Sequence, residues 1–150
     1  MKHDVLPNWD FSIPVRLDTA KPSHCQFEVA ALQGDFVGLV TPMAGGGYKL
    51  TVSSNESELV QNFTKAYLLA EAIVYKPKEE VGVTRDNFHP APSKFRIAHC
   101  QRLAMAYLMP KQALDFLILK QKHTALESLS QKLNVSEMAL HTRLKLLGWI

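Results

Sequence analysis

Short apolar runs near the start of the chain have the composition and spacing of β-strands. Three such runs are rich in Val, Phe, Leu and Thr and are separated by Gly and Pro: CQFEVAALQ (25–33), DFVGLVT (35–41) and YKLTVSS (48–54). Three consecutive glycines, Gly45 to Gly47, lie between the second and third runs and predict a flexible hairpin connection. No GKS or GKT follows them, so a surface turn is favoured over a phosphate-binding loop. The pattern therefore predicts a small N-terminal β-sheet.

The hydrophobic period changes from strand-like to helical after residue 55. Apolar residues then recur with helical spacing at Leu59, Phe63, Ala66, Ala70 and Ile73. They predict an amphipathic helix over Glu56–Tyr75, with a capping box at Asn55 and Glu58 and an end before Pro77. The polar stretch that follows, KPKEEVGVTRDNFHPAP (76–92), predicts a surface loop.

Caps and breakers divide the C-terminal part of the chain into four further helices. Ser93 predicts the start of a helix that runs to Met109, and Pro110 predicts the start of another over KQALDFLILKQK (111–122). The first of the last two helices is predicted from a capping box at Thr124 and Glu127 and from an apolar face of Leu126, Leu129 and Leu133, with a left-handed turn at Asn134. The second is predicted to start at the N-cap Ser136 and to end at Gly148. This layout is typical of a helix-turn-helix segment.

The composition is that of an ordinary soluble globular protein. The 150 residues are 47% hydrophobic and 21% charged, which fits one domain with at most a small appendage. We expect neither a membrane span nor a secretory signal, because no apolar run is long enough and MKHDVLPNWDF (1–11) has no apolar core. The formal net charge of +3 permits an acidic partner or nucleic acid but demands neither. These features predict a cytoplasmic protein.

Two His-Cys pairs, His24-Cys25 and His99-Cys100, contain both cysteines of the chain. Their spacing matches no CxxC-type zinc site, and adjacent side chains on a helix point about 100° apart. Nothing in the sequence marks an activated thiolate, so a Cys/His nucleophile is not favoured either. We expect both cysteines to be reduced thiols that pack as small hydrophobic side chains.

Three motifs occur in a characteristic order between Tyr48 and Gly148. A strand precedes FTKAYLLAEAIVY (63–75), QRLAMAYLMP (101–110) follows, and LSQKLNVSEMALHTRLKLLG (129–148) completes the series. This order resembles the ImmA/IrrE family of zinc-dependent metallopeptidases, whose typical members read FT-x-AHEL-x-H, AN-x-FAAELLMP and LA-x-x-F-x-VS-x-x-A-x-x-RL-x-x-LG. The residues in step with these patterns are Phe63, Thr64, Leu108, Met109, Pro110, Leu129, Leu133, Val135, Ser136, Ala139, Arg143, Leu144, Leu147 and Gly148.

The resemblance implies an α+β fold in which the small N-terminal sheet packs on a helical zincin-like core. It implies a degenerate metallopeptidase-like region over residues 1–110, and a helical, helix-turn-helix-like segment over 111–150 that packs on it. Alignment puts Tyr67 and Glu71 at the two zinc-binding histidines, Leu68 at the catalytic glutamate and His99 at the acidic third ligand. Leucine cannot take a proton from water, so we expect no catalysis. Because both histidine ligands are missing, we also expect no cofactor, with zinc kept as the less favoured possibility.

Two arrangements of these aligned residues stay open from the sequence. In one, the oxygen atoms of Tyr67 and Glu71 and a nitrogen of His99 hold zinc weakly. In the other, Glu71 and His99 form a hydrogen-bonded or ionic pair across two helices, and Tyr67 packs over them. We favour the second, because a site without its two histidines rarely keeps zinc.

A catalytically inactive relative of this family is expected to recognise a partner without cutting it. The resemblance implies that the partner is a repressor-type regulator of a phage or mobile element, whose activity changes through occupancy, as with an antirepressor. We predict that Tyr67, Glu71, His99 and Phe116 bind this partner. Phe116 is included because the apolar run 116–119 must be partly exposed unless something covers it.

Two other functions stay open as alternatives. The first is a small DNA-binding regulator, although Glu137 would repel phosphate and no basic stripe is present. Its DNA-binding residues would be Ser136, His141, Thr142, Arg143 and Lys145. The second is a metal-dependent peptidase with an altered metal site.

Overall fold

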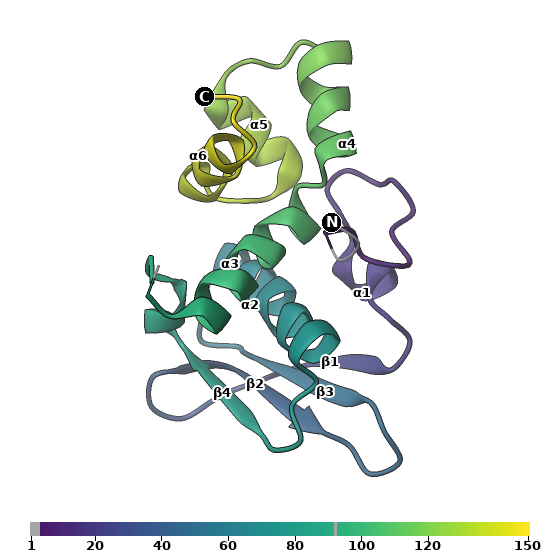
Figure 1. Cartoon of the computed structure of the whole chain (residues 1–150), viewed down its shortest axis with the longest axis vertical. Coiled ribbons are helices and arrows are strands. Elements are labelled where there is room, and N and C mark those ends of the chain that lie inside the picture. The colour runs from purple at the N-terminus through teal and green to yellow at the C-terminus, as the bar shows by residue number, and fades with distance from the viewer. Residues whose placement is uncertain (1–3, 92) are drawn as a thin grey trace.

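The computed structural model describes residues 4–91 and 93–150, and this part of the chain has an α+β fold. A four-stranded mixed sheet lies at one end, and six α-helices extend from one of its faces to the other end (Figure 1). The strands are β1 (Cys25–Ala30), β2 (Phe36–Pro42), β3 (Tyr48–Ser53) and β4 (Val81–Thr84). The α-helices are α1 (Leu17–Ala20), α2 (Glu58–Ala70), α3 (Phe95–Leu108), α4 (Lys111–Asp115), α5 (Leu126–Leu133) and α6 (Glu137–Leu146). The predicted α+β class is confirmed.

The sheet has the strand order β1-β3-β2-β4, in which β1 runs parallel to β3 and β2 runs antiparallel to both of its neighbours. The turn between β2 and β3 contains Gly45 to Gly47, whose φ angles lie between 84° and 98°. Glycine adopts such angles at little cost, and the turn is closed by the Met43 N–H, which donates to Gly47 O at 3.0 Å. The predicted hairpin connection is therefore confirmed.

Strand β4 lies inside the stretch 76–92, so the prediction of a surface loop is wrong for residues 81–84. Its backbone pairs with β2, with Gly82 opposite Leu39. The glycine lets the Phe36 ring lie directly over β4, because a Cβ atom on Gly82 would be 2.3 Å from Cε1 of Phe36. A strand of four residues between charged segments is too short to produce a clear hydrophobic alternation.

Helix α2 crosses one face of the sheet and is covered on its other side by α3 (Figure 1). It starts at the N-cap Ser57, whose Oγ accepts from Val60 N at 3.3 Å, so the predicted cap at Asn55 is wrong. It continues as the π-helical turn η1 (Glu71–Tyr75) and ends at Lys76, which has a φ of 46°. Because α2 lies between the sheet and α3, it is buried on two faces, whereas an amphipathic surface helix is buried on one.

Helix α3 begins two residues after its predicted cap. Its first residue is Phe95, and Lys94 at the N-cap position forms no side-chain cap bond, so the prediction of a cap at Ser93 is wrong. After Pro110, α4 continues as a second π-helical turn, η3 (Phe116–Lys120). The two together confirm the helical prediction for residues 111–120, two residues short of the predicted end at 122.

Helices α5 and α6 pack on each other, and α6 also packs on α3. Asn134 has the predicted left-handed conformation, with a φ of 57°, and Ser136 Oγ caps α6 by accepting from Ala139 N at 3.1 Å. The predicted capping box at Thr124 and Glu127 is wrong, because Ala125 occupies the N-cap position of α5. Whether this pair of helices functions as a helix-turn-helix stays a prediction.

The N-terminal segment from Asp4 to Ala20 runs along the side of the helical layer (Figure 1). It has little regular structure, yet it contributes buried side chains to the core: Leu6, Trp9, Val15, Leu17 and Ala20. Within the described residues, none of the helices combines the length and apolar character that crossing a membrane requires.

Candidate functional site

Three residues that align with the ImmA/IrrE zinc site, Tyr67 and Leu68 of α2 and Glu71 of η1, lie inside the protein. Tyr67 and Leu68 are 0% exposed, and Glu71 is 3% exposed. Leu68 packs against the sheet, where a Cβ atom on Gly38 of β2 would be 3.1 Å from its Cδ1. Neither Tyr67 nor Glu71 reaches the surface. The prediction that these two residues bind a partner is therefore wrong.

The buried carboxylate of Glu71 is paired with Arg96 of α3. The Arg96 Nε lies 3.0 Å from Oε1 and 3.1 Å from Oε2, and its terminal Nη2 donates a further bond to Oε2. This hydrogen bonding raises the pKa of Arg96, which keeps its charge. The predicted pairing of Glu71 with His99 is therefore wrong, since the sequence contains a better partner one turn earlier on the same helix.

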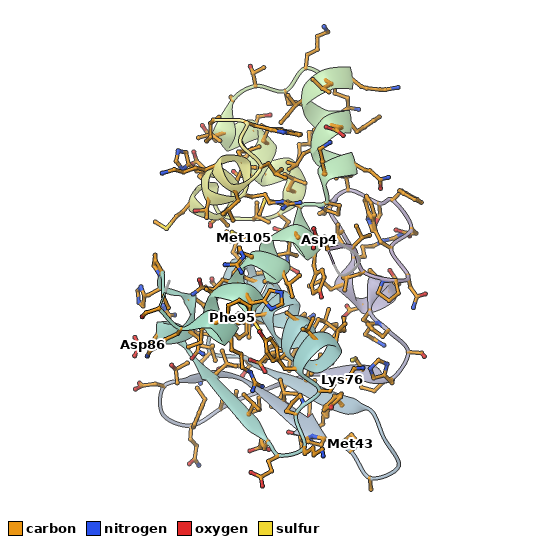
Figure 2. The ribbon with its side chains drawn as sticks, viewed as in Figure 1. Asp4, Met43, Lys76, Asp86, Phe95 and Met105 are labelled. Carbon is orange, nitrogen blue, oxygen red and sulfur yellow. The ribbon has the colours of Figure 1, made fainter. Side chains whose placement is uncertain are left out.

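His99 is held by Tyr75 at the end of η1 instead. The Tyr75 hydroxyl and Nδ1 of His99 share a hydrogen bond of 2.9 Å. The Arg96 guanidinium lies over the Tyr75 ring, 4.6 Å from its centre. Figure 2 labels Phe95 at the start of α3 and Lys76 directly after η1, the two helical ends that carry this cluster. The helical spacing of the apolar residues does not by itself indicate that Tyr75 and Arg96 connect the end of η1 to the start of α3.

Both cysteines are buried thiols, as predicted. Burial, and secondarily the charge of Glu71, raises the pKa of the Cys100 thiol, which donates a weak hydrogen bond to Glu71 Oε1 at 3.5 Å. Burial also raises the pKa of Cys25 to about 11. Metal binding and nucleophilic attack need the thiolate, so neither side chain is prepared for these reactions at neutral pH.

The donors around Glu71 do not fit a zinc site. Both Glu71 oxygens are bound by Arg96, His99 is bound by Tyr75, and the Tyr67 hydroxyl accepts from Nδ2 of Asn87 at 3.3 Å. Over residues 4–91 and 93–150, no three His, Cys, Asp or Glu side chains are grouped closely enough to hold a metal ion. The cluster joins α2 and η1 to α3, and its chemistry is that of an ion pair between a buried carboxylate and a half-exposed arginine.

An apolar groove lies between the N-terminal segment and the start of α4. It has a volume of about 350 Å³ and is lined by Trp9, Phe11, Ile13, Gln112, Ala113 and Phe116. Phe116 is 43% exposed and Leu119 is 68% exposed, whereas Leu117 is buried, so the apolar run 116–119 does face outwards in part. Of the predicted partner-binding residues, Phe116 thus lies on a concave apolar surface of the kind that binds ligands.

The N-terminal wall of this groove is ordered by polar contacts. Phe11 has a φ of 66°, which is rare for a bulky residue, and its side chain is 69% exposed. Its ring lies 4.8 Å from that of Trp9, whose indole N–H donates to Ser12 O at 3.0 Å. Asp10 accepts from Arg16 at 2.7 Å. The segment thus displays an aromatic side chain at the surface. In the sequence, only the closely spaced aromatic residues Trp9 and Phe11 could have indicated this exposed aromatic surface.

A second groove, also of about 350 Å³, lies at one end of the sheet and has a polar lining. Within it, Arg85 forms a forked ion pair with Glu56, with Nε–Oε1 and Nη2–Oε2 distances of 2.6 and 2.8 Å. Asp35 and Asp86 also line this groove. Since Arg85 is already engaged by Glu56, this groove shows no group poised for an acidic ligand, and the sequence predicts no functional residue in it.

The five residues predicted to bind DNA do not share one surface. Ser136, His141, Thr142 and Lys145 are exposed on α6. Arg143 is only 9% exposed, and its Nε donates to Met109 O at 3.0 Å. Burial lowers its pKa, and the charge of Asp4, labelled in Figure 2, opposes that shift. Arg143 therefore joins α6 to the end of α3, and its prediction as a DNA-binding residue is wrong.

We expect Arg143→Met to lower the free energy of unfolding by about 2 kcal/mol, because it removes a charged hydrogen bond to a buried carbonyl. Lys145→Met, an exposed change of the same charge on the same helix, should change it by less than about 0.5 kcal/mol. Urea unfolding at low protein concentration measures both. Equal, small effects would contradict the structural role of Arg143.

Comparison with models of known protein families gives no match for this chain, and comparison with curated proteins gives none either. The resemblance to the ImmA/IrrE family therefore stays a prediction that rests on three short motifs and their order.

Proposed function

We propose that this protein is a non-catalytic binding module that takes up a helix of a regulatory protein in the groove between Phe11 and Phe116. The observation that carries the proposal is the groove itself, with exposed aromatic side chains on both walls. Exposed apolar concavities of this kind mark interaction sites, because leaving such surface in water is unfavourable. Leu119 extends the apolar surface along η3 beyond the groove.

The charges beside the groove favour a partner helix with acidic flanks. The segment that follows α4 carries Lys120 and Lys122, and neither forms an ion pair with a described residue. Two further pairs of charges on the same two segments are engaged with each other, Lys111 with Asp115 and Asp10 with Arg16. An amphipathic helix with Leu or Phe on one face and Glu or Asp at its border complements such a surface.

The resemblance to the ImmA/IrrE family suggests that the partner is a repressor-type regulator of a phage or mobile element. Occupancy alone changes a regulator's activity when the bound helix is needed for its dimerisation or DNA binding, because binding then favours its inactive state. Catalysis is not part of the proposal, since Leu68 lies at the position of the catalytic base and Arg96 holds the only aligned carboxylate.

The test is a selection from a displayed library of amphipathic helices, with Leu, Phe and Met varied on the apolar face and Glu or Lys at the flanks. We expect helices with acidic flanks to be enriched on the wild-type protein. Phe116→Asp should bind the same helices about 30-fold more weakly, a loss of about 2 kcal/mol, because it places a charge at the centre of the apolar contact.

Phe95→Asp is the matched control, because Phe95 is 69% exposed and lies on α3 outside the groove. It should bind the selected helices as the wild type does. Equal binding by wild type and Phe116→Asp would overturn the groove as the site. For the regulatory step, a reporter gene under a repressor that contains a selected helix should be derepressed by the wild type and not by Phe116→Asp.

A further inference from the structure

Helix α6 leaves one face uncovered at the far end of the molecule from the sheet (Figure 1). Met138 is 80% exposed, more than any other large hydrophobic residue in the described part of the chain, and Leu146 is 51% exposed. The opposite face of α6 is packed into the protein through Leu140 and Leu144. The exposed face therefore carries an apolar residue at each end.

The charges of this face are arranged with opposite signs at its two ends. Glu137 lies in the first turn of α6 and Lys145 in the last. Both are exposed, and neither forms an ion pair with another residue in the described ranges. At 100° per residue, Glu137, His141 and Lys145 follow one flank of the exposed face, while Met138 and Thr142 lie along its centre.

We propose that this face binds the same face of a second copy of the chain, with the two α6 helices antiparallel. In antiparallel helix pairs, the same flank of each helix meets its counterpart. With the two-fold axis near His141, Glu137 of each copy lies opposite Lys145 of the other, so both ends gain an attractive pair. Met138 then packs between Thr142 and Leu146 of the second copy. Such a contact is isologous and closes at two copies.

This face carries His141, Thr142 and Lys145, three of the residues predicted to bind DNA, and its chemistry favours a second copy instead. A helix that reads DNA needs positive charge toward the phosphates. Here the acidic Glu137 stands in the first turn, Met138 is 80% exposed near the centre of the face, and the arginine of the helix is directed into the protein. The contact is independent of the proposed groove, since no residue of α6 lines it.

The contact area is small, because each copy contributes one helix of ten residues. Interfaces below about 1,200 Å² in total belong to weak or transient associations. We therefore expect a reversible dimer with a dissociation constant on the order of 10–100 µM.

The test is a charge swap, followed by sedimentation velocity of the full chain over roughly 5–500 µM, a range that brackets such a weak association. Each single reversal, Lys145→Glu or Glu137→Lys, should weaken dimerisation by at least about tenfold, because it places like charges opposite each other at both ends. The double variant restores both attractive pairs and should dimerise like the wild type. Circular dichroism spectra that are unchanged in all variants show that α6 remains folded.

A wild-type chain that stays monomeric over this range, or single reversals without effect, would overturn the proposal. So would failure of the double variant to recover while it remains folded. The DNA-binding alternative makes a different forecast for a gel shift with a mixed-sequence duplex. There, Lys145→Glu loses binding and the double variant does not recover it, because its acid still faces the phosphates.

Discussion

Arg96→Ala should lower the free energy of unfolding by about 3 kcal/mol, because it leaves the Glu71 carboxylate buried without its partner. Removing one member of a buried ion pair costs about 3–5 kcal/mol, since the charge that remains is neither solvated nor compensated. We expect the lower end of that range. The Arg96 side chain is 46% exposed, so in the variant water partly takes its place beside the carboxylate. The Glu71 side chain itself is only 4% exposed. Equilibrium unfolding in urea at neutral pH measures the difference.

Two further variants separate the ion pair from other effects of the substitution. Arg102→Ala removes an exposed arginine from the same helix and should change stability by less than about 0.5 kcal/mol. Adding Glu71→Gln to Arg96→Ala removes the uncompensated charge and should recover about half or more of the loss. A double variant less stable than Arg96→Ala would show that Glu71 stabilises the fold through contacts other than this pair.

The elements with a clear hydrophobic period are also the ones that the sequence predicted well. The helix predicted over Glu56–Tyr75 occurs as α2 and η1, with ends that differ by at most two residues. The left-handed turn at Asn134 and the cap at Ser136 were likewise predicted, because only a few residue types suit those positions. β4 was missed, because its pairing with β2 depends on residues 41 to 48 positions away.

The candidate site was predicted less well, and the reason is the double burial of α2. The apolar residues from Leu59 to Ile73 suggest one buried face, which leaves Tyr67 and Glu71 elsewhere on the helix. The helix in fact contacts the sheet on one side and α3 on the other. An alignment of motifs states which residues correspond, but not whether their surroundings are open to solvent.

The groove between Phe11 and Phe116 could also be predicted only in part, because the sequence indicates one of its walls and not the other. The sequence predicted that the run 116–119, which includes Phe116, would be partly exposed, because a helix cannot bury four consecutive apolar residues against one neighbour. Its opposite wall comes from residues 9–13, which have no periodic pattern. That wall is positioned by long-range packing and local polar contacts, such as the one between Asp10 and Arg16. Contacts of this kind leave little trace in a single sequence.

Leu68→Glu, which places a glutamate where the catalytic residue of the ImmA/IrrE family aligns, should lower the free energy of unfolding by about 4 kcal/mol or more. Leu68 is 0% exposed, and its side chain packs from α2 against Gly38 of the sheet. A carboxylate there has no partner and no water, which costs about 4 kcal/mol or more. A domain of this size is stable by about 5–15 kcal/mol, so the loss consumes much of its stability. Thermal unfolding followed by circular dichroism measures the effect.

Leu68→Met is the control for this prediction, because it changes the shape of the side chain at similar volume and should cost less than about 1.5 kcal/mol. If Leu68→Glu were as stable as Leu68→Met, the position would be open to water, as a catalytic position must be. The ImmA/IrrE resemblance would then describe a cleft that has only lost its metal. If Leu68→Glu is destabilised by about 4 kcal/mol or more, the motif on α2 serves to pack the sheet against α3, and any surface for recognition must lie elsewhere.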